Sequence, residues 1–139
     1  MEKLSHEFHE LSFYTLDHPD KVYFIHQHVV DAYQAQTADT QTKPIGLLFS
    51  LVGLCLYLEK NYTGRQVQLA HMQLAKNKKN WPSIDLPDTK GKIDVTYVLK
   101  SPAGSARDQM IKEWCTSVWK AYKNSHKTIL LFIKKELEV

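Results

Sequence analysis

Apolar residues recur at intervals of three and four along most of the chain, which is the spacing of helices that each bury one face. The first such segment runs from Leu4 to Leu16 and is expected to end at His18-Pro19, because the residue before a proline disfavours the helical conformation. The second is expected to begin at Pro19 and to extend to Gln36. It is apolar on more than one side, which is typical of a central helix in a bundle.

The third segment, Ile45 to Leu58, is apolar on all sides, and we expect a buried core helix there. A strip of small residues runs along it, formed by Gly46, Ser50 and Gly53. Glycine inside a helix costs about 1 kcal/mol relative to alanine, so close approach of another helix is the expected compensation. Asn61 is expected to end this helix. Thr63-Gly64-Arg65-Gln66 has the pattern of a capping box that begins a fourth one.

Residues 80–91 predict an irregular connection, because Trp81-Pro82 and Leu86-Pro87 both interrupt regular structure. Residues 92–100 alternate between apolar and polar as a strand would. The chain offers no second strand to satisfy the backbone groups of such an isolated strand. We therefore favour a short helical turn capped by Asp94.

Beyond this turn, Ser105-x-x-Asp108 has the pattern of a helix N-terminus. One apolar stripe then continues in steps of three or four, through Ile111, Cys115, Val118, Tyr122, His126, Ile129, Ile133 and Leu137. This stripe predicts one long helix, bent near Asn124-Ser125. The predicted fold is all-α: a single-domain bundle of about five helices over residues 1–139, with a long C-terminal helix and an irregular Trp-Pro-containing connection.

The composition is that of a folded domain, with 43% hydrophobic and 24% charged residues. A net charge of +3 is too small and too dispersed to indicate nucleic-acid binding. No apolar run reaches the roughly 20 residues of a membrane span, and the first residues lack a secretory signal. Cys55 and Cys115 lie far apart in apolar surroundings, so we expect buried, reduced thiols in a cytoplasmic protein.

The densest polar chemistry lies between His26 and Gln36, where two imidazoles, a carboxylate, a phenol and three amides are interleaved with apolar residues. His28 and Asp31 are three residues apart, so their side chains should be neighbours on one helix face. We expect a buried polar pocket formed by His28, Asp31, Tyr33 and His126. The candidate ligand-pocket residues are His28, Asp31, Tyr33, Gln36 and Tyr122.

Imidazoles and carboxylates that project inward from several helices form the metal sites of helical bundles. His71 and His126 each occupy an apolar stripe position, so the candidate metal ligands are His28, Asp31, His71 and His126. Histidine-rich sites suit divalent zinc, nickel or iron better than magnesium. A metal-bound water of lowered pKa would then serve as the nucleophile of a hydrolase.

Two other interpretations compete with a ligand site. His28 and Asp31 could form a structural polar network, because buried polar groups are normally hydrogen-bonded. The chain could also be a non-enzymatic homodimer, with the third helix or the aromatic C-terminal helix as its interface. Neither the ligand nor the reaction follows from these residues.

Four ordered blocks carry a family resemblance: residues 28–36 (HVVDAYQAQ), residues 51–59 (LVGLCLYLE), Trp81-Pro82 with Pro87, and residues 114–122 (WCTSVWKAY) followed by His126. On these blocks the chain resembles a family of small uncharacterised bacterial proteins, a domain of unknown function. The likeness extends from His28 to about Ile133 and leaves the N-terminal helix outside. It supports the predicted fold and draws attention to His28, Asp31, Gln36 and His126, and it implies no reaction.

Overall fold

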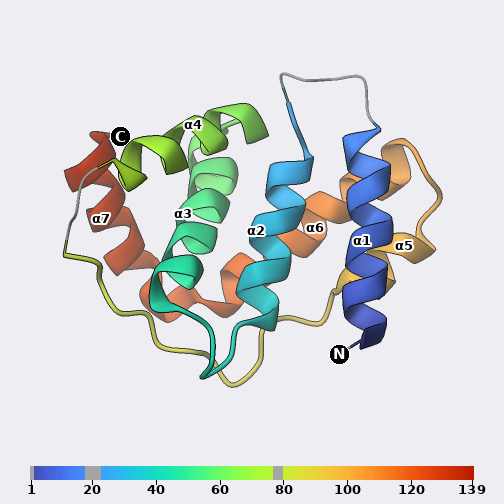
Figure 1. The fold of residues 1–139 in the computed structure, drawn as a ribbon, viewed down its shortest axis with the longest axis horizontal. Coiled ribbons are helices and arrows are strands. Elements are labelled where there is room, and N and C mark those ends of the chain that lie inside the picture. Colours follow the sequence, from blue (N-terminus) through green and yellow to red (C-terminus); the bar gives the residue numbers. More distant parts are fainter. Residues whose placement is uncertain (1, 18–22, 77–79) are drawn as a thin grey trace.

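Two helices, α2 (His26–Thr37) and α3 (Pro44–Lys60), lie side by side in the middle of this computed structural model, which describes residues 2–17, 23–76 and 80–139 (Figure 1). At one end lie α1 (Glu2–Leu16) and the short α5 (Val95–Lys100), and at the other α4 (Gly64–Ala75) and α7 (His126–Leu137). Helix α6 (Ser105–Ala121) passes across α2 and α3 and connects the two ends. The predicted all-α class is confirmed, and all regular structure in the described ranges is helical.

The expected count of about five helices is too low, since the described residues form seven α-helices. One addition is α5, where the predicted helical turn is confirmed and Asp94 caps it by accepting a hydrogen bond from the Tyr97 N–H at 3.0 Å. The capping box at the start of α4 is also confirmed, with reciprocal bonds between Thr63 and Gln66. Asn61 ends α3 in the left-handed conformation.

The single long C-terminal helix is wrong. Helix α6 ends at Ala121, a 3-10 turn follows at Lys123–Ser125, and α7 begins at His126. The His126 ring stacks on the Trp119 ring, with centroids 3.8 Å apart, and its Nε2–H donates to the Trp119 carbonyl oxygen at 2.8 Å. His126 therefore satisfies a carbonyl at the end of α6, which is where the helical hydrogen bonds run out.

One predicted helix start is wrong, and one predicted cap is not formed. The second helix begins at His26, and residues 23–25 before it are not helical, while the proposed start at Pro19 lies outside the described residues. Helix α6 begins at Ser105, as the sequence predicts, but its N-cap residue is Gly104 and no side chain caps it. Asp108 instead accepts a hydrogen bond from the Tyr14 hydroxyl at 2.9 Å, which ties α6 to α1.

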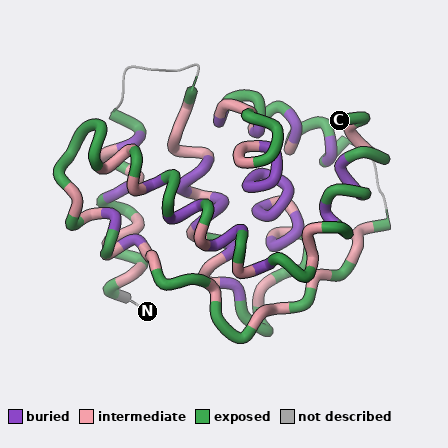
Figure 2. The backbone as a smooth tube through the Cα atoms, turned by 180° about the vertical axis from the view of Figure 1, so that it is seen from behind, coloured by how far each residue is buried: buried purple, intermediate pink, exposed green. Residues whose placement is uncertain are grey.

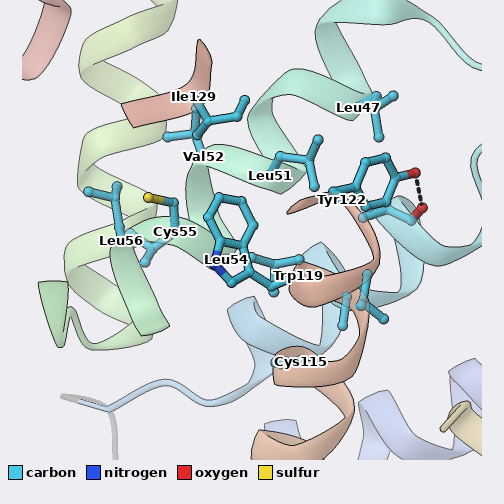
Figure 3. Packing of buried hydrophobic residues seen from close by; sticks show 14 of the residues in the cluster. Leu47, Leu51, Val52, Leu54, Cys55, Leu56, Cys115, Trp119, Tyr122 and Ile129 are labelled. Carbon is cyan, nitrogen blue, oxygen red and sulfur yellow. Dashed lines mark hydrogen bonds between the residues drawn. The ribbon is translucent and has the colours of Figure 1, made fainter. Parts of the chain in front are cut away.

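The core is built around α3, whose middle turns are buried throughout (Figure 2). Leucines of α3 pack against Trp119 and Tyr122 at the end of α6 (Figure 3). Most of the apolar surface of α3 is buried inside the chain, which leaves little of it for the homodimer interface considered from the sequence. No helix among the described residues combines the length and the apolar character that crossing a membrane requires.

The strip of small residues on α3 faces α2, as close packing requires. A Cβ atom built on Gly53 would lie only 1.9 Å from Oδ2 of Asp31, so glycine is the only residue that admits this carboxyl. One turn earlier, the Ser50 hydroxyl donates to Oε1 of Gln34 at 3.0 Å. Gly46 differs, because a Cβ there meets no atom within 4 Å.

These two glycines give a matched test of the packing. We expect Gly53→Ala to lower the free energy of unfolding by about 2–3 kcal/mol, because the new methyl group overlaps the Asp31 carboxyl. Gly46→Ala should raise it by up to about 1 kcal/mol, because the site is open and helical alanine is favoured over glycine. Urea denaturation followed by circular dichroism measures both, and equal effects of the two substitutions would contradict the close approach of α2 to α3.

Candidate functional site

His28 lies on the face of α2 that is turned toward the C-terminal half of α3. Its ring is stacked almost parallel on the Tyr57 ring, with centroids 3.5 Å apart and an interplanar angle of 8°. The side chain is only 4% exposed, and its Nδ1 has no hydrogen-bond partner. Since buried polar atoms are almost always paired, this nitrogen has an unused capacity for a hydrogen bond.

His28 and Tyr57 form part of the wall of a cavity of about 340 Å³. The other residues of this His28 cavity come from the segment before α2, from the end of α3 and the start of α4, and from α6: Tyr23, Ile25, Leu58, Asn61, Tyr62, Thr63, Asp108 and Lys112. Aromatic rings dominate the wall, and the polar groups lie among them. Cavities of this size and lining are typical of sites for small organic molecules.

At one wall of the His28 cavity, the segment before α2 crosses the start of α4, and the backbone there is strained. The Gly64 N–H donates to the Tyr23 carbonyl oxygen at 2.6 Å, and a Cβ on Gly64 would lie 1.9 Å from the Phe24 carbonyl oxygen. Phe24 itself has a φ of 43°, which is an outlier for a bulky side chain. Strained backbone of this kind persists only where the surroundings hold it, and it gathers at functional sites.

Burial determines the charge state of the His28 ring. Removal from water disfavours the imidazolium form and lowers the pKa of His28 to about 4. Burial likewise raises the pKa of the Tyr57 hydroxyl, with a smaller contribution from Cys115. At neutral pH the stacked pair is therefore uncharged, and His28 can donate through one ring nitrogen and accept through the other.

Asp31 is one turn further along α2 and is 2% exposed. Its Oδ1 accepts a hydrogen bond from Nε2 of Gln27 at 3.2 Å, and its Oδ2 has no partner. Burial raises the pKa of Asp31 well above its ordinary value, and the Gln27 bond offsets only part of this effect. The hydrogen-bonded His28–Asp31 pair considered as an alternative from the sequence is not formed: Asp31 is bonded to Gln27, and Nδ1 of His28 and Oδ2 of Asp31 both lack partners.

Asp31 lines a second cavity, of about 370 Å³, together with His71. The Nε2–H of His71 donates to the Phe49 carbonyl oxygen at 2.8 Å, and burial lowers the pKa of the ring. Within the described residues, therefore, the structure brings Asp31 and His71 to one cavity and His28 to another. Neither cavity includes His126.

Three further candidates from the sequence contact parts of the fold away from both cavities. Tyr33 stacks on Phe8 of α1 with ring centroids 4.1 Å apart. Gln36 accepts from the Trp114 indole N–H at 2.9 Å and donates to the Ile93 carbonyl oxygen at 2.7 Å. These bonds hold the irregular connection and α6 against α2, which accounts for the presence of an amide at this position.

Tyr122 is buried, and its hydroxyl donates to the Ala35 carbonyl oxygen at 2.7 Å (Figure 3). The bond joins the end of α6 to α2. The described residues contain no group of three or more His, Cys, Asp and Glu side chains arranged to hold a metal ion. The four candidate metal ligands are accordingly divided between two cavities and the α6–α7 break.

The sequence did not indicate most of the His28 cavity. Asp108 and Lys112 are four residues apart on α6, which could have been recognised as a polar face, and Tyr57 is the single tyrosine of the apolar helix α3. No local pattern shows that these residues meet Asn61 and Tyr23. Their convergence depends on how four separate segments pack.

The charge state of His28 can be tested through the pH dependence of stability. In the unfolded chain His28 binds a proton below about pH 6.5, whereas in the folded chain it does so only near its lowered pKa of about 4. The unfolded state therefore binds more protons between these values, and the free energy of unfolding should fall as the pH is lowered through this range. His28→Phe keeps the stacking on Tyr57 and removes the proton, so it should reduce this slope by up to about 1.4 kcal/mol per pH unit.

The measurement is a series of urea denaturations of both proteins between pH 4 and pH 8. His26 and His71, whose pKa values are also lowered by burial, should keep part of the slope in the variant. Above pH 7 the slope contributed by His28 should vanish, which provides an internal control. Identical slopes in the acidic range would show that folded His28 is protonated like an exposed histidine.

Comparison with known proteins gives one match. The model of the family of unknown function DUF5946 matches residues 5–123. The match includes most of α1, which the resemblance seen in the sequence left out, and it ends before His126. No curated protein and no solved structure matches the chain. Because the matched residues make up most of its length, the chain belongs to the DUF5946 family, a family of unknown function.

Proposed function

We propose that this chain is a small-molecule-binding protein whose ligand occupies the His28 cavity. The observation that carries the proposal is a buried imidazole with an unpartnered Nδ1 in the wall of a cavity of about 340 Å³. An unsatisfied buried polar group costs about 1–3 kcal/mol, and retaining it is expected where it serves binding. The two cysteines are free and buried, which supports the further proposal of a cytoplasmic location.

The lining of the His28 cavity favours a planar ligand with one polar substituent. The aromatic side chains of Tyr23, Tyr57 and Tyr62 offer ring faces and edges for stacking. Lys112 supplies an ammonium group at the wall, which Asn61 and Thr63 also line. A flat aromatic carboxylic acid or carboxamide can stack on the tyrosine rings and form hydrogen bonds with these polar groups.

We favour an organic ligand over a divalent metal and metal-assisted hydrolysis. A metal site needs three or four donors within bonding distance of one point. His28, Asp31, His71 and His126 contact different partners: Tyr57, Gln27, Phe49 and Trp119, respectively. In particular, the ring nitrogens of His71 and His126 that donate to backbone carbonyls are not available as metal ligands.

Ligand-detected NMR with phenol, benzamide and benzoate tests the proposal. We expect saturable binding of at least one probe, with chemical-shift changes confined to the residues of the His28 cavity. His28→Phe should weaken that binding by up to about tenfold, the equivalent of one lost hydrogen bond. If none of the three probes binds, or if the shifts map outside the cavity, the proposal is wrong.

Lys112 allows a matched control on the same helix. Lys112→Gln should weaken the binding of benzoate more than that of benzamide, because only the carboxylate gains from the ammonium group. Lys120 is exposed on α6 two turns later and does not line the His28 cavity, so Lys120→Gln should leave both affinities unchanged. Equal effects of the two substitutions would indicate a general influence of charge rather than a contact in the cavity.

A further inference from the structure

The second cavity lies on the other side of α2, between that helix, the N-terminal half of α3, and α4. It has a volume of about 370 Å³ and is lined by Gln27, Val30, Asp31, Gln34, Ile45, Gly46, Phe49 and His71. Gln34 and Ile45 are exposed at its rim. We call it the Asp31 cavity.

The lining of the Asp31 cavity contains two ionisable side chains, those of Asp31 and His71. Asp31 is the one acidic residue in its lining, and none of the residues that line it is lysine or arginine. His71 is held as a donor to the Phe49 carbonyl oxygen and is kept uncharged by burial. The cavity therefore presents a carboxyl group without a basic side chain to balance it.

The carboxyl of Asp31 is also incompletely bonded. A single hydrogen bond of 3.2 Å reaches Oδ1 from Gln27, and Oδ2 lies unpartnered against Gly53. A buried polar atom without a hydrogen-bond partner is energetically unfavourable, so the carboxyl has a bonding capacity that a ligand can satisfy. Nothing in the packing of α2 on α3 requires an acid rather than an amide here.

We propose that the Asp31 cavity is a second binding site and that it takes an organic cation carrying an ammonium group. The ammonium group would displace the Gln27 amide from Oδ1 of Asp31 and form a charge-assisted hydrogen bond there. The organic part of the ligand would lie against Val30, Ile45 and the Phe49 ring, which also attracts a cation. This site is separate from the His28 cavity, so neither proposal depends on the other.

Binding at this site exchanges a proton for the ligand. In the empty cavity burial raises the pKa of Asp31 and so favours the protonated, neutral carboxyl. When the ammonium group arrives, the carboxyl ionises, the proton leaves to solvent, and the ion pair remains. Each pH unit below the pKa of Asp31 should therefore weaken binding about tenfold.

The proton released on binding comes from Asp31 itself and not from the groups that are packed against it. From α6, the buried Cys115 thiol lies near it, and burial together with Asp31 raises the pKa of that thiol, so it stays protonated. From α4, His71 is neutral and already bonded to Phe49. From α3, the facing residue is Gly53, which does not titrate.

Isothermal titration calorimetry with benzylamine and with benzyl alcohol, its uncharged counterpart, tests the proposal. We expect benzylamine to bind saturably and more tightly than benzyl alcohol. The observed heat should depend on the ionisation enthalpy of the buffer, as it must when a proton is released. Asp31→Asn keeps the size of the side chain and should abolish both the preference for the amine and the dependence on buffer.

Gly46→Leu supplies a second variant that leaves Asp31 in place. Gly46 lines the cavity, and a Cβ there meets nothing within 4 Å, so a larger side chain should fill the cavity while the fold is kept. Benzylamine should no longer bind to this variant. The proposal is overturned if benzylamine does not bind to the unmodified protein, or if it binds equally well to Asp31→Asn or to Gly46→Leu.

Discussion

The close contact between α2 and α3 is the constraint on which the rest of the structure depends. Gly53 leaves room for the Asp31 carboxyl, and the His28 ring, one turn earlier on α2, lies flat on Tyr57, one turn later on α3. Two polar side chains are thereby held in an interface that would otherwise be apolar. The hydrophobic burial of α3 between α2, α4, α6 and α7 has to offset their desolvation.

This interface also explains why His28 and Asp31 behave as separate groups. An ion pair between them would need a charged imidazole and a charged carboxylate, and burial disfavours both charges. The ring is neutral because its pKa is lowered to about 4, and burial raises the pKa of the acid, which favours its neutral form. Each is directed to its own cavity, one on either side of α2, with a hydrogen-bonding capacity that the protein does not use.

The fold could be predicted from the sequence further than the site. Helical periodicity, the Thr63–Gln66 capping box and the Asp94 cap are local, and the structure confirms them. The apolar stripe from Ile111 to Leu137 gave the wrong prediction of one long helix, because periodicity alone cannot distinguish a continuous helix from two helices joined by a turn. Spacing correctly placed His28 and Asp31 on the face of α2 that meets α3. It could not show that Tyr33 would be stacked on Phe8, nor that Lys112 and Asn61 would share a cavity.

The 3-10 turn at Lys123–Ser125 separates the last helix from the rest of the domain. The family match ends at Lys123, so the turn that separates α6 from α7 is also the limit of the matched residues. Every residue that lines either cavity lies before this limit, and α7 contributes none. The residues that line the two cavities and the residues of the last helix are therefore separate along the chain, although α7 packs on α3 and α4. Helix α7 completes the core through its buried Ile129 and Ile133, and the His126–Trp119 contact ties its first turn to the end of α6.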